Sequence, residues 1–211
     1  MTNAADFLPS ELGLEGLREA VEGCRGCELW ACASRAVPGE GPPDAQVMLV
    51  GEQPGNEEDL TGRPFVGPAG RLLDRALAEV GLDRSEVYLT NVVKHFRSEP
   101  RGKRRIHKKP GDEHIEACRP WLEAEIAMVR PAVLVCLGAT AAKALLGPEF
   151  RVSRERGAFV PSPLAPHVIA TVHPSSVLRA PDEGRRRDAY ARFVRDLGHV
   201  ADRVRGLSEL G

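Results

Sequence analysis

The sequence predicts an α/β fold, a three-layer α/β/α sandwich in which helices cover both faces of a central four-stranded parallel sheet. Short apolar runs bounded by turn residues alternate along the chain with longer segments of helical periodicity. This alternation is typical of right-handed βαβ crossovers, which place successive strands parallel in one sheet. A length of 211 residues suits one domain with a sizeable core, so we expect residues 1–211 to form a single domain.

Four short runs have the length and the flanking residues of buried strands. QVMLV, the first, lies between turn residues, as expected of a strand that is covered on both faces. The expected strands are residues 46–50, 87–91, 132–138 and 167–173.

Segments of helical periodicity lie between and around these strands. Gly67 and Pro68 open one of them, leucines follow at helical spacing, and Gly81 ends it. Pro131 stops another. The expected helices are residues 10–23, 67–81, 112–129, 139–146 and 185–205, and the N-terminal segment 1–45 is expected to pack on the α/β core.

Composition narrows the possible environments and partners. The net charge is −1, so affinity for nucleic acid must come from local concentrations of the 29 Lys and Arg residues. The first residues lack the cationic flank of a secretory signal, and no stretch approaches the roughly 18 apolar residues of a membrane span. We therefore expect a cytoplasmic protein without a membrane partner. We also expect it to be a monomer. In that compartment the five cysteines favour metal binding or burial over disulfides.

The segment RSEPRGKRRIHKKPG, residues 97–111, is a polar stretch punctuated by Gly and Pro. We expect a loop, and a loop of this length without a role is uncommon in a compact domain. A short cationic run by itself usually indicates a solvated or nonspecific nucleic-acid patch, but here it surrounds a single imidazole, that of His107. The five cations expected to attract DNA phosphates are Lys103, Arg104, Arg105, Lys108 and Lys109.

Polar residues follow the carboxyl ends of several expected strands, where ligands bind in open parallel sheets. The first strand runs into Gly51, Glu52 and Gln53, the second into Asn91, and the fourth into the HPSS stretch that begins at His173. We expect these residues to form one pocket. Neither a Walker lysine motif nor GxGxxG follows the first strand, which argues against a nucleotide cofactor.

Cys24 and Cys27 form a CxxC motif that precedes the first expected strand. Redox pairs of the thioredoxin type instead follow a strand at the start of a helix, so the motif favours a metal site. Cys136 lies within an expected strand and is interpreted as a buried core residue.

Several ordered motifs together resemble the uracil-DNA glycosylase superfamily. They are GEQPG, GRPFVGPAGRLL, TNVVK, LGATAAKALLG and HPSS, at residues 51–55, 62–73, 90–94, 137–147 and 173–176. The branch that they resemble is the iron-sulfur branch, family four. GEQPG combined with KRRIHK resembles its UdgX subgroup, whose members crosslink to uracil-containing DNA through the loop histidine. The resemblance covers roughly residues 23–205.

The resemblance implies a role for each motif, although every residue also has an ordinary structural interpretation as a turn, cap or core residue. It places Glu52 where a carboxylate can stabilise a cationic sugar or orient a water. It makes His173 a donor to uracil O2 as negative charge develops. The residues that it assigns to the uracil pocket are Gly51, Gln53, Phe65, Asn91 and Ser175.

The resemblance also implies a [4Fe-4S] cluster. Cys24, Cys27 and Cys118 match the family's ligands, and His95 stands where ordinary members have a further cysteine. We expect His95 to be the fourth ligand, with Cys32 as the alternative, and Zn²⁺ in a Cys₃His site is the alternative metal.

The expected function is excision of uracil from DNA, preferably single-stranded, ending in a covalent bond between His107 and C1′ of the deoxyribose. The neighbouring cations are expected to keep the imidazole neutral, and Glu52, in contact with it, is expected to take up the proton lost on alkylation. Leu178 and Arg179 are candidates for a wedge in the duplex.

Two alternatives remain open at this point. One is a turnover uracil-DNA glycosylase in which a water activated by Glu52 replaces His107 as the nucleophile. The other is a non-enzymatic iron-sulfur module that only binds DNA. Asn56 stands where the UdgX subgroup usually has Asp, which bears on the rate of reaction.

Overall fold

The computed structural model describes residues 2–9, 13–102 and 104–209. Its main sheet has five strands in the order β2-β1-β5-β7-β6. The four expected strands are present and parallel, but β6 adds a fifth, antiparallel to β7, at one edge. β6 has only two residues, too short to give a periodic signal in the sequence. The strands are β1 (Val47–Gly51), β2 (Val87–Asn91), β5 (Val133–Leu137), β6 (Phe159–Val160) and β7 (His167–Thr171).

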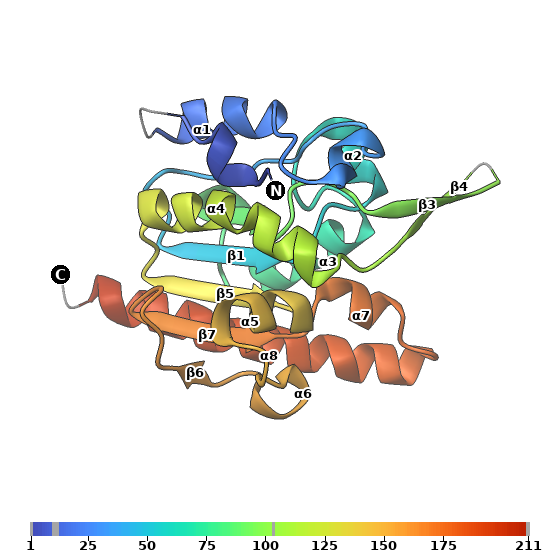
Figure 1. Cartoon of the computed structure of the whole chain (residues 1–211). Helices are drawn as coiled ribbons and strands as arrows, with labels where there is room; N and C mark the ends of the chain where they lie inside the picture. The colour runs from blue at the N-terminus through green and yellow to red at the C-terminus, as the bar shows by residue number, and fades with distance from the viewer. Residues whose placement is uncertain (1, 10–12, 103, 210–211) are drawn as a thin grey trace.

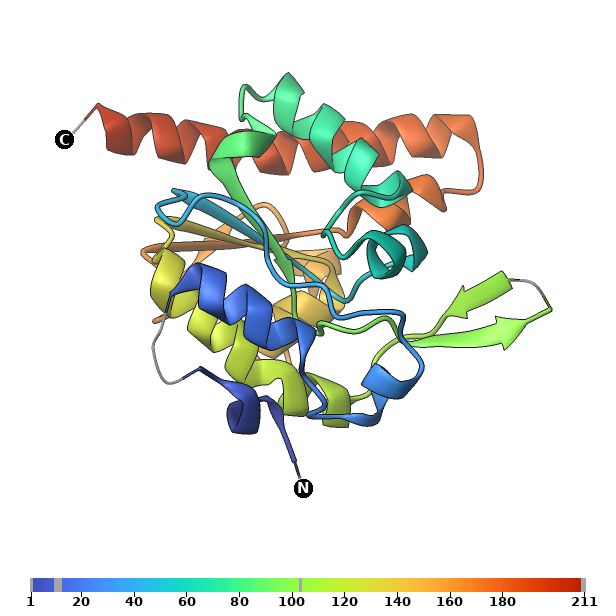
Figure 2. The same ribbon diagram turned by 90° about the horizontal axis from the view of Figure 1, so that it is seen from above.

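Helices cover both faces of the sheet, which confirms the α/β/α sandwich (Figures 1 and 2). One core lies between the sheet and helices α1, α4 and α5, and the other between the sheet and helices α3, α7 and α8. Side chains alternate between the two cores along each strand, so that Met48 faces one and Leu49 the other. The α-helices are α1 (Leu14–Glu22), α2 (Asn56–Thr61), α3 (Pro68–Glu79), α4 (Asp112–Val129), α5 (Ala139–Leu146), α6 (Val152–Glu155), α7 (Pro174–Leu178) and α8 (Glu183–Ser208).

The expected bounds of β2, α4 and α5 agree with the structure, whereas α2, α6 and α7 were not predicted. These three helices have at most six residues, less than two full turns, so periodicity cannot reveal them. Residues 10–12 of the first expected helix lie outside the described residues. The 3₁₀ segments are η1 (Ala4–Phe7), η2 (Glu28–Ala31) and η3 (Arg84–Glu86). Among the described helices, none is long and apolar enough to cross a membrane.

The cationic segment forms a hairpin, not the irregular loop that we expected. Strands β3 (Ser98–Arg101) and β4 (Arg104–His107) pair antiparallel, and the hairpin projects from the body of the molecule (Figures 1 and 2). Gly102, with φ +60°, provides the left-handed conformation that a tight turn needs. Pro100 is tolerated because a two-stranded ribbon leaves its outer edges unpaired. Ser98 pairs with His107, which places His107 at the base of the hairpin, next to the body.

Candidate active site

A cavity of about 880 Å³ opens at the carboxyl edge of the sheet, within the usual size of a small-molecule site. The loop after β1, the end of β2, the base of the hairpin and α7 all contribute lining residues, although they are far apart in the sequence. The structure therefore brings most of the expected catalytic and uracil-pocket residues together. Those that line the cavity are Glu52, Gln53, Phe65, Asn91, His107, Lys109, His173, Ser175 and Arg179.

Gly51 allows the floor of this cavity to close. A Cβ atom at Gly51 would lie 2.4 Å from Asn91 Oδ1 and 2.7 Å from Phe65 Cζ, so only glycine lets both side chains pack here. Phe65 has φ 55°, which is strained for an aromatic residue, and its ring stacks on the His173 imidazole at a centroid distance of 6.1 Å. An aromatic face and an amide are thus held side by side.

The contacts of His173 fix its proton on the nitrogen that is free to donate. Nδ1 accepts the Ser175 backbone N–H at 3.2 Å and lies 2.8 Å from Ser175 Oγ. A backbone N–H can only donate, so Nδ1 bears no proton and Nε2 carries it. The pKa of His173 is lowered to about 4, mainly by burial and to a smaller extent by the nearby Arg179 and His107 side chains. His173 is therefore a neutral hydrogen-bond donor at neutral pH.

Glu52 is held between α5 and the hairpin. Its Oε2 accepts a hydrogen bond from the Thr140 hydroxyl, and its Oε1 lies 3.5 Å from His107 Nε2. Thr140 belongs to the first turn of α5, where the helix dipole favours an anion. The role of Thr140 was not predicted from the sequence, because one hydroxyl inside LGATAAKALLG carries no signal of its own.

The contacts of Gln53 determine which ring nitrogen of His107 carries the proton. The Gln53 side-chain oxygen accepts the Arg97 N–H at 3.1 Å, and its Nε2 donates to the Lys108 carbonyl oxygen at 2.9 Å. These two bonds fix the orientation of the amide, so the Nε2 that lies 2.9 Å from His107 Nε2 is a donor. His107 Nε2 must then be the acceptor, with the proton on Nδ1.

Burial lowers the pKa of His107, the nearby Glu52 carboxylate opposes this effect, and the charge of Arg179 adds to it. The neutral ring that we expected is therefore supported, but for another reason. Partial burial is the main cause, and the cation that contributes comes from the end of α7 and not from the hairpin. The side chain remains 50% exposed, so a substrate can reach it.

Arg105 makes contacts within the protein and does not point freely outward as a phosphate contact would. Its guanidinium bonds Asn56 Oδ1 at 3.0 Å, Ser34 Oγ at 3.2 Å and the buried Asp59 carboxylate at 2.5 Å. These bonds fasten the hairpin to α2 and to the segment after η2. Lys108 pairs with Glu99 at 2.8 Å.

The remaining cationic and wedge residues have varied positions. Lys109 lines the cavity, and Leu178 and Arg179 are exposed at the end of α7. Lys103 and the side chain of Arg104 lie outside what the structure describes.

The three expected cysteine ligands come together between the N-terminal segment and α4. Cys24 Sγ accepts the Trp121 indole N–H at 3.2 Å and the Gly26 N–H at 3.4 Å, and Cys118 Sγ accepts the Lys94 N–H at 3.2 Å. Burial raises the pKa of Cys118 to about 12, and the nearby Cys27 and Cys24 also raise it. Converging sulfurs with N–H donors fit an iron-sulfur cluster, because such donors stabilise cluster thiolates.

The spacing of the cysteine sulfurs does not support a zinc site. A tetrahedral Zn²⁺ with Zn–S bonds of about 2.3 Å brings its sulfur ligands within about 4 Å of one another. Among the described residues, only Glu28, Glu113 and His114 form a group with ligand atoms within 4.8 Å of one another.

The two candidates for the fourth ligand differ in their surroundings. His95 is buried, and burial lowers its pKa to about 4 while Asp59 opposes the shift, so its imidazole is neutral and able to bind a metal. Cys32 is exposed on the segment after η2. Cys136 is buried within β5, as predicted.

Two buried acidic groups beside the site escaped the sequence analysis. Glu58 in α2 lines the cavity and accepts the Gly67 N–H at 2.9 Å, which fixes the loop before α3. Glu125 in α4 pairs at 2.7 Å with Lys94, and both side chains are buried. This pair fixes the backbone between Asn91 and His95. No motif around Glu58 or Glu125 in the sequence indicates these roles.

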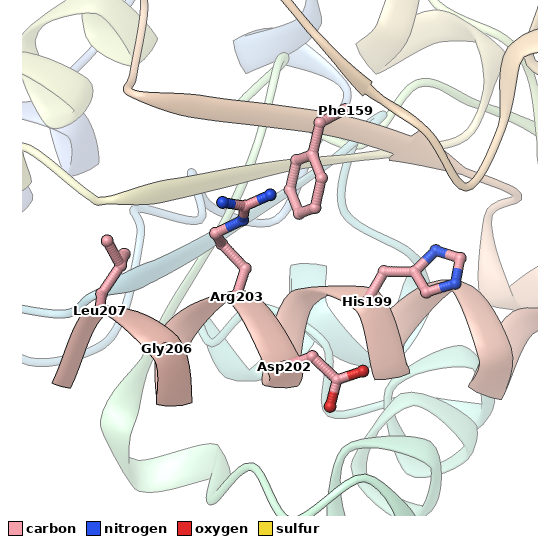
Figure 3. A pocket seen from close by; sticks show the side chains of 6 residues that line it. All are labelled: Phe159, His199, Asp202, Arg203, Gly206 and Leu207. Carbon is pink, nitrogen blue, oxygen red and sulfur yellow. The ribbon is translucent and has the colours of Figure 1, made fainter. Parts of the chain in front are cut away.

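A second hollow, of about 420 Å³, lies between β6 and α8 (Figure 3). Arg203 covers the Phe159 ring at 5.0 Å, and His199 Nδ1 lies 2.7 Å from the Gly157 carbonyl oxygen. Asp202 pairs with Arg205 at 2.6 Å. None of the expected site residues lines this hollow, and each of its three charged or polar side chains already has a partner, so we assign it no function.

At the carboxyl edge of the sheet, a carboxylate, an amide and two neutral imidazoles line one cavity. Such a set of groups can perform acid-base and nucleophilic chemistry. The chain belongs to the uracil DNA glycosylase superfamily, whose family model matches residues 38–198.

Named relatives agree with this assignment. The chain is 37% identical over 192 residues to a type-4 uracil-DNA glycosylase of Sulfurisphaera tokodaii, covering 87% of this chain and 84% of the relative. It is 41% identical over 167 residues to a type-4 uracil-DNA glycosylase of Thermotoga maritima, covering 79% and 83%. A type-5 uracil-DNA glycosylase of Thermus thermophilus is 34% identical over 171 residues, covering 72% and 73%.

Proposed function

We propose that this protein acts in DNA repair by recognising uracil in DNA, cleaving its N-glycosidic bond and forming a covalent bond between His107 and C1′ of the deoxyribose. The observation that carries the proposal is the proximity of His107 Nε2 to Glu52 Oε1, which lie 3.5 Å apart. A neutral nucleophile and an anion thus face the same part of the cavity. The relatives named as uracil-DNA glycosylases support the excision step.

Recognition begins with a uracil lifted from the strand into the cavity. The Phe65 ring replaces the stacking that the base loses, and the Asn91 amide bonds the amide-like edge of uracil. His173 Nε2–H donates to uracil O2, where negative charge grows as the bond to C1′ breaks. Uracil leaves with the electron pair of that bond, and the sugar becomes an oxocarbenium ion stabilised by the Glu52 carboxylate.

Capture follows when the Nε2 lone pair of His107 leaves its hydrogen bond with the Gln53 amide and forms a bond to C1′. The alkylated ring is then a cation that still carries a proton on Nδ1. Loss of that proton to solvent leaves a neutral substituent on C1′, which is a poor leaving group. Turnover stops at this point, so each protein molecule acts once.

The contacts change the expected role of Glu52. It faces Nε2, the nitrogen that is alkylated, and is therefore not placed to take the proton from Nδ1. Its proposed role is to stabilise the cationic sugar and to hold the reacting carbon near the imidazole.

A turnover uracil-DNA glycosylase is the second candidate, and it is favoured by the type-4 relatives. In this alternative Glu52 orients a water that attacks C1′ in place of His107. The pocket is the same, and only the nucleophile differs.

The resident group that fits the sulfur site best is a [4Fe-4S] cluster held by Cys24, Cys27, Cys118 and His95. Such a cluster would serve structure here, because its ligands join the N-terminal segment to α4 and to the base of the hairpin. No step of the reaction depends on it.

The experiment that separates these proposals counts uracil released per protein molecule. Single-stranded DNA with one uracil is supplied in excess, and both free uracil and a detergent-stable protein-DNA band are measured. Capture predicts a burst of at most one uracil per protein with an equal amount of adduct. Steady release without adduct would support the turnover candidate, and equal reaction with thymine-containing DNA would remove both.

A further inference from the structure

Four large apolar side chains are exposed in the described part of the chain: Trp30 (43%), Leu60 (55%), Ile106 (39%) and Leu178 (37%). They belong to η2, α2, β4 and α7, and the last three elements lie at the end of the molecule to which the parallel strands point (Figure 1). Exposed apolar side chains that gather on one end of a protein indicate an interaction surface.

Trp30 is the aromatic member of this group. The guanidinium of Arg25 lies over its ring at 4.9 Å from the centroid. Arg25 and Arg35 are exposed, and neither has a carboxylate partner among the residues that the structure describes, whereas Arg63 and Arg71 are paired with acids. A half-exposed indole beside arginines that have no carboxylate partner among the described residues suits a polyanion that carries planar rings.

The Arg105 contacts connect this surface to the active site. Arg105 bonds Ser34, four residues after Trp30, and Asp59, next to Leu60. Trp30 and Ser34 have Cα atoms at most about 14 Å apart, because an extended chain spans about 3.5 Å per residue. His107 lies two residues beyond Arg105 on the same strand. Trp30 is thus within a few nucleotides of the cavity.

We propose that Trp30 and Arg25 form a stacking platform that holds an unpaired base of single-stranded DNA beside the nucleotide in the cavity. The cavity's occupant rests on the proposed function, whereas the platform requires only single-stranded DNA. A base within a duplex is already stacked on its neighbours and cannot lie on the indole. The platform therefore makes the protein prefer single strands.

Binding of a labelled, uracil-free oligothymidine to the whole protein tests the platform independently of excision. Trp30→Ala is expected to weaken binding about tenfold, in the range of one lost base-aromatic stack. Trp30→Phe should retain most of the wild-type affinity for the oligothymidine. The affinity of Trp30→Ala for duplex DNA should differ less than twofold from that of the wild type. Tyr190→Ala is the matched control, since Tyr190 also carries an arginine, Arg75, over its ring at 4.8 Å but lies on α8. It should bind like the wild type.

Tryptophan emission provides a measurement that needs no variant. The chain has two tryptophans, and Trp121 is fully buried, so a base stacked on Trp30 is expected to quench emission from the exposed indole alone. Unchanged emission at saturating oligothymidine, or equal loss of single-strand and duplex binding in Trp30→Ala, would overturn the platform. If the platform result holds while uracil is never released, the proposed function fails and the platform stands.

Discussion

The Gln53 side-chain amide donates to His107 Nε2 at 2.9 Å, and the same amide bonds the backbone on both sides of the hairpin. One side chain therefore sets the position of the proposed nucleophile and the nitrogen that bears its lone pair. Breaking this contact should affect capture more than excision.

Gln53→Ala tests that relationship. Losing hydrogen bonds worth about 1 kcal/mol each should slow adduct formation about tenfold or more. Uracil release should fall less, because Glu52, Asn91 and His173 keep their contacts. The ratio of adduct to free uracil, measured in one reaction, should therefore be lower in Gln53→Ala than in the wild type. An unchanged ratio would mean that Gln53 does not position His107.

Thr140 is expected to act through Glu52. Thr140→Val removes the hydroxyl that donates to the carboxylate while keeping the shape of the side chain. Hydrogen bonds to charged groups contribute about 1.5–3 kcal/mol, so uracil release should slow by roughly tenfold to a hundredfold. Thr140→Ser should restore most of the rate. Equal loss in both variants would indicate a packing defect and no orienting role.

Acid should stop the reaction only well below neutrality. His107 and His173 must both be neutral, and burial lowers the pKa of each, that of His173 to about 4. A lowered pKa extends the neutral form toward lower pH, so capture should lose half of its rate below pH 6.5, the ordinary imidazole value, and most of it by about pH 4, where His173 also gains a proton. Rates of adduct formation across this range test the expectation. Half-loss at about pH 6.5 would contradict it.

Arg105 should matter for stability more than for phosphate binding. Arg105→Ala leaves the buried Asp59 carboxylate without its cation, which is expected to lower the free energy of unfolding by about 3 kcal/mol. Urea unfolding measures this change, and Arg101→Ala on the exposed part of β3 is the control. A variant of wild-type stability whose DNA binding has a salt dependence reduced by about one ion would instead make Arg105 a phosphate contact.

The cluster assignment predicts a coloured protein that contains iron and sulfide. Cys118→Ala should lose the visible absorbance and unfold more readily, whereas His95→Cys should keep it, because a thiolate replaces an imidazole at the same position. Metal analysis and absorbance spectra measure both effects. Zinc without iron would overturn the assignment, and loss of colour in Cys32→Ala but not in His95→Ala would move the fourth ligand.

Much of this architecture could be predicted from the sequence, because the periodic spacing of apolar residues indicates the strands and helices that face a core. The bounds of α4 and β2 agreed for that reason. The hairpin was missed because polar strands that face solvent have no apolar alternation to detect. Thr140 and Glu58 were missed because their roles depend on residues distant in sequence, which only the folded chain brings within hydrogen-bond distance.

Covalent capture by His107 is the central claim, and mapping the adduct tests it most directly. Wild-type protein is incubated with uracil-containing single-stranded DNA, boiled in detergent, digested and analysed by mass spectrometry. We expect the deoxyribose mass on the peptide that contains His107, and in His107→Ala no adduct but continued release of uracil, with water as the acceptor at C1′. An adduct on another residue, or an adduct of normal yield in His107→Ala, would contradict the account.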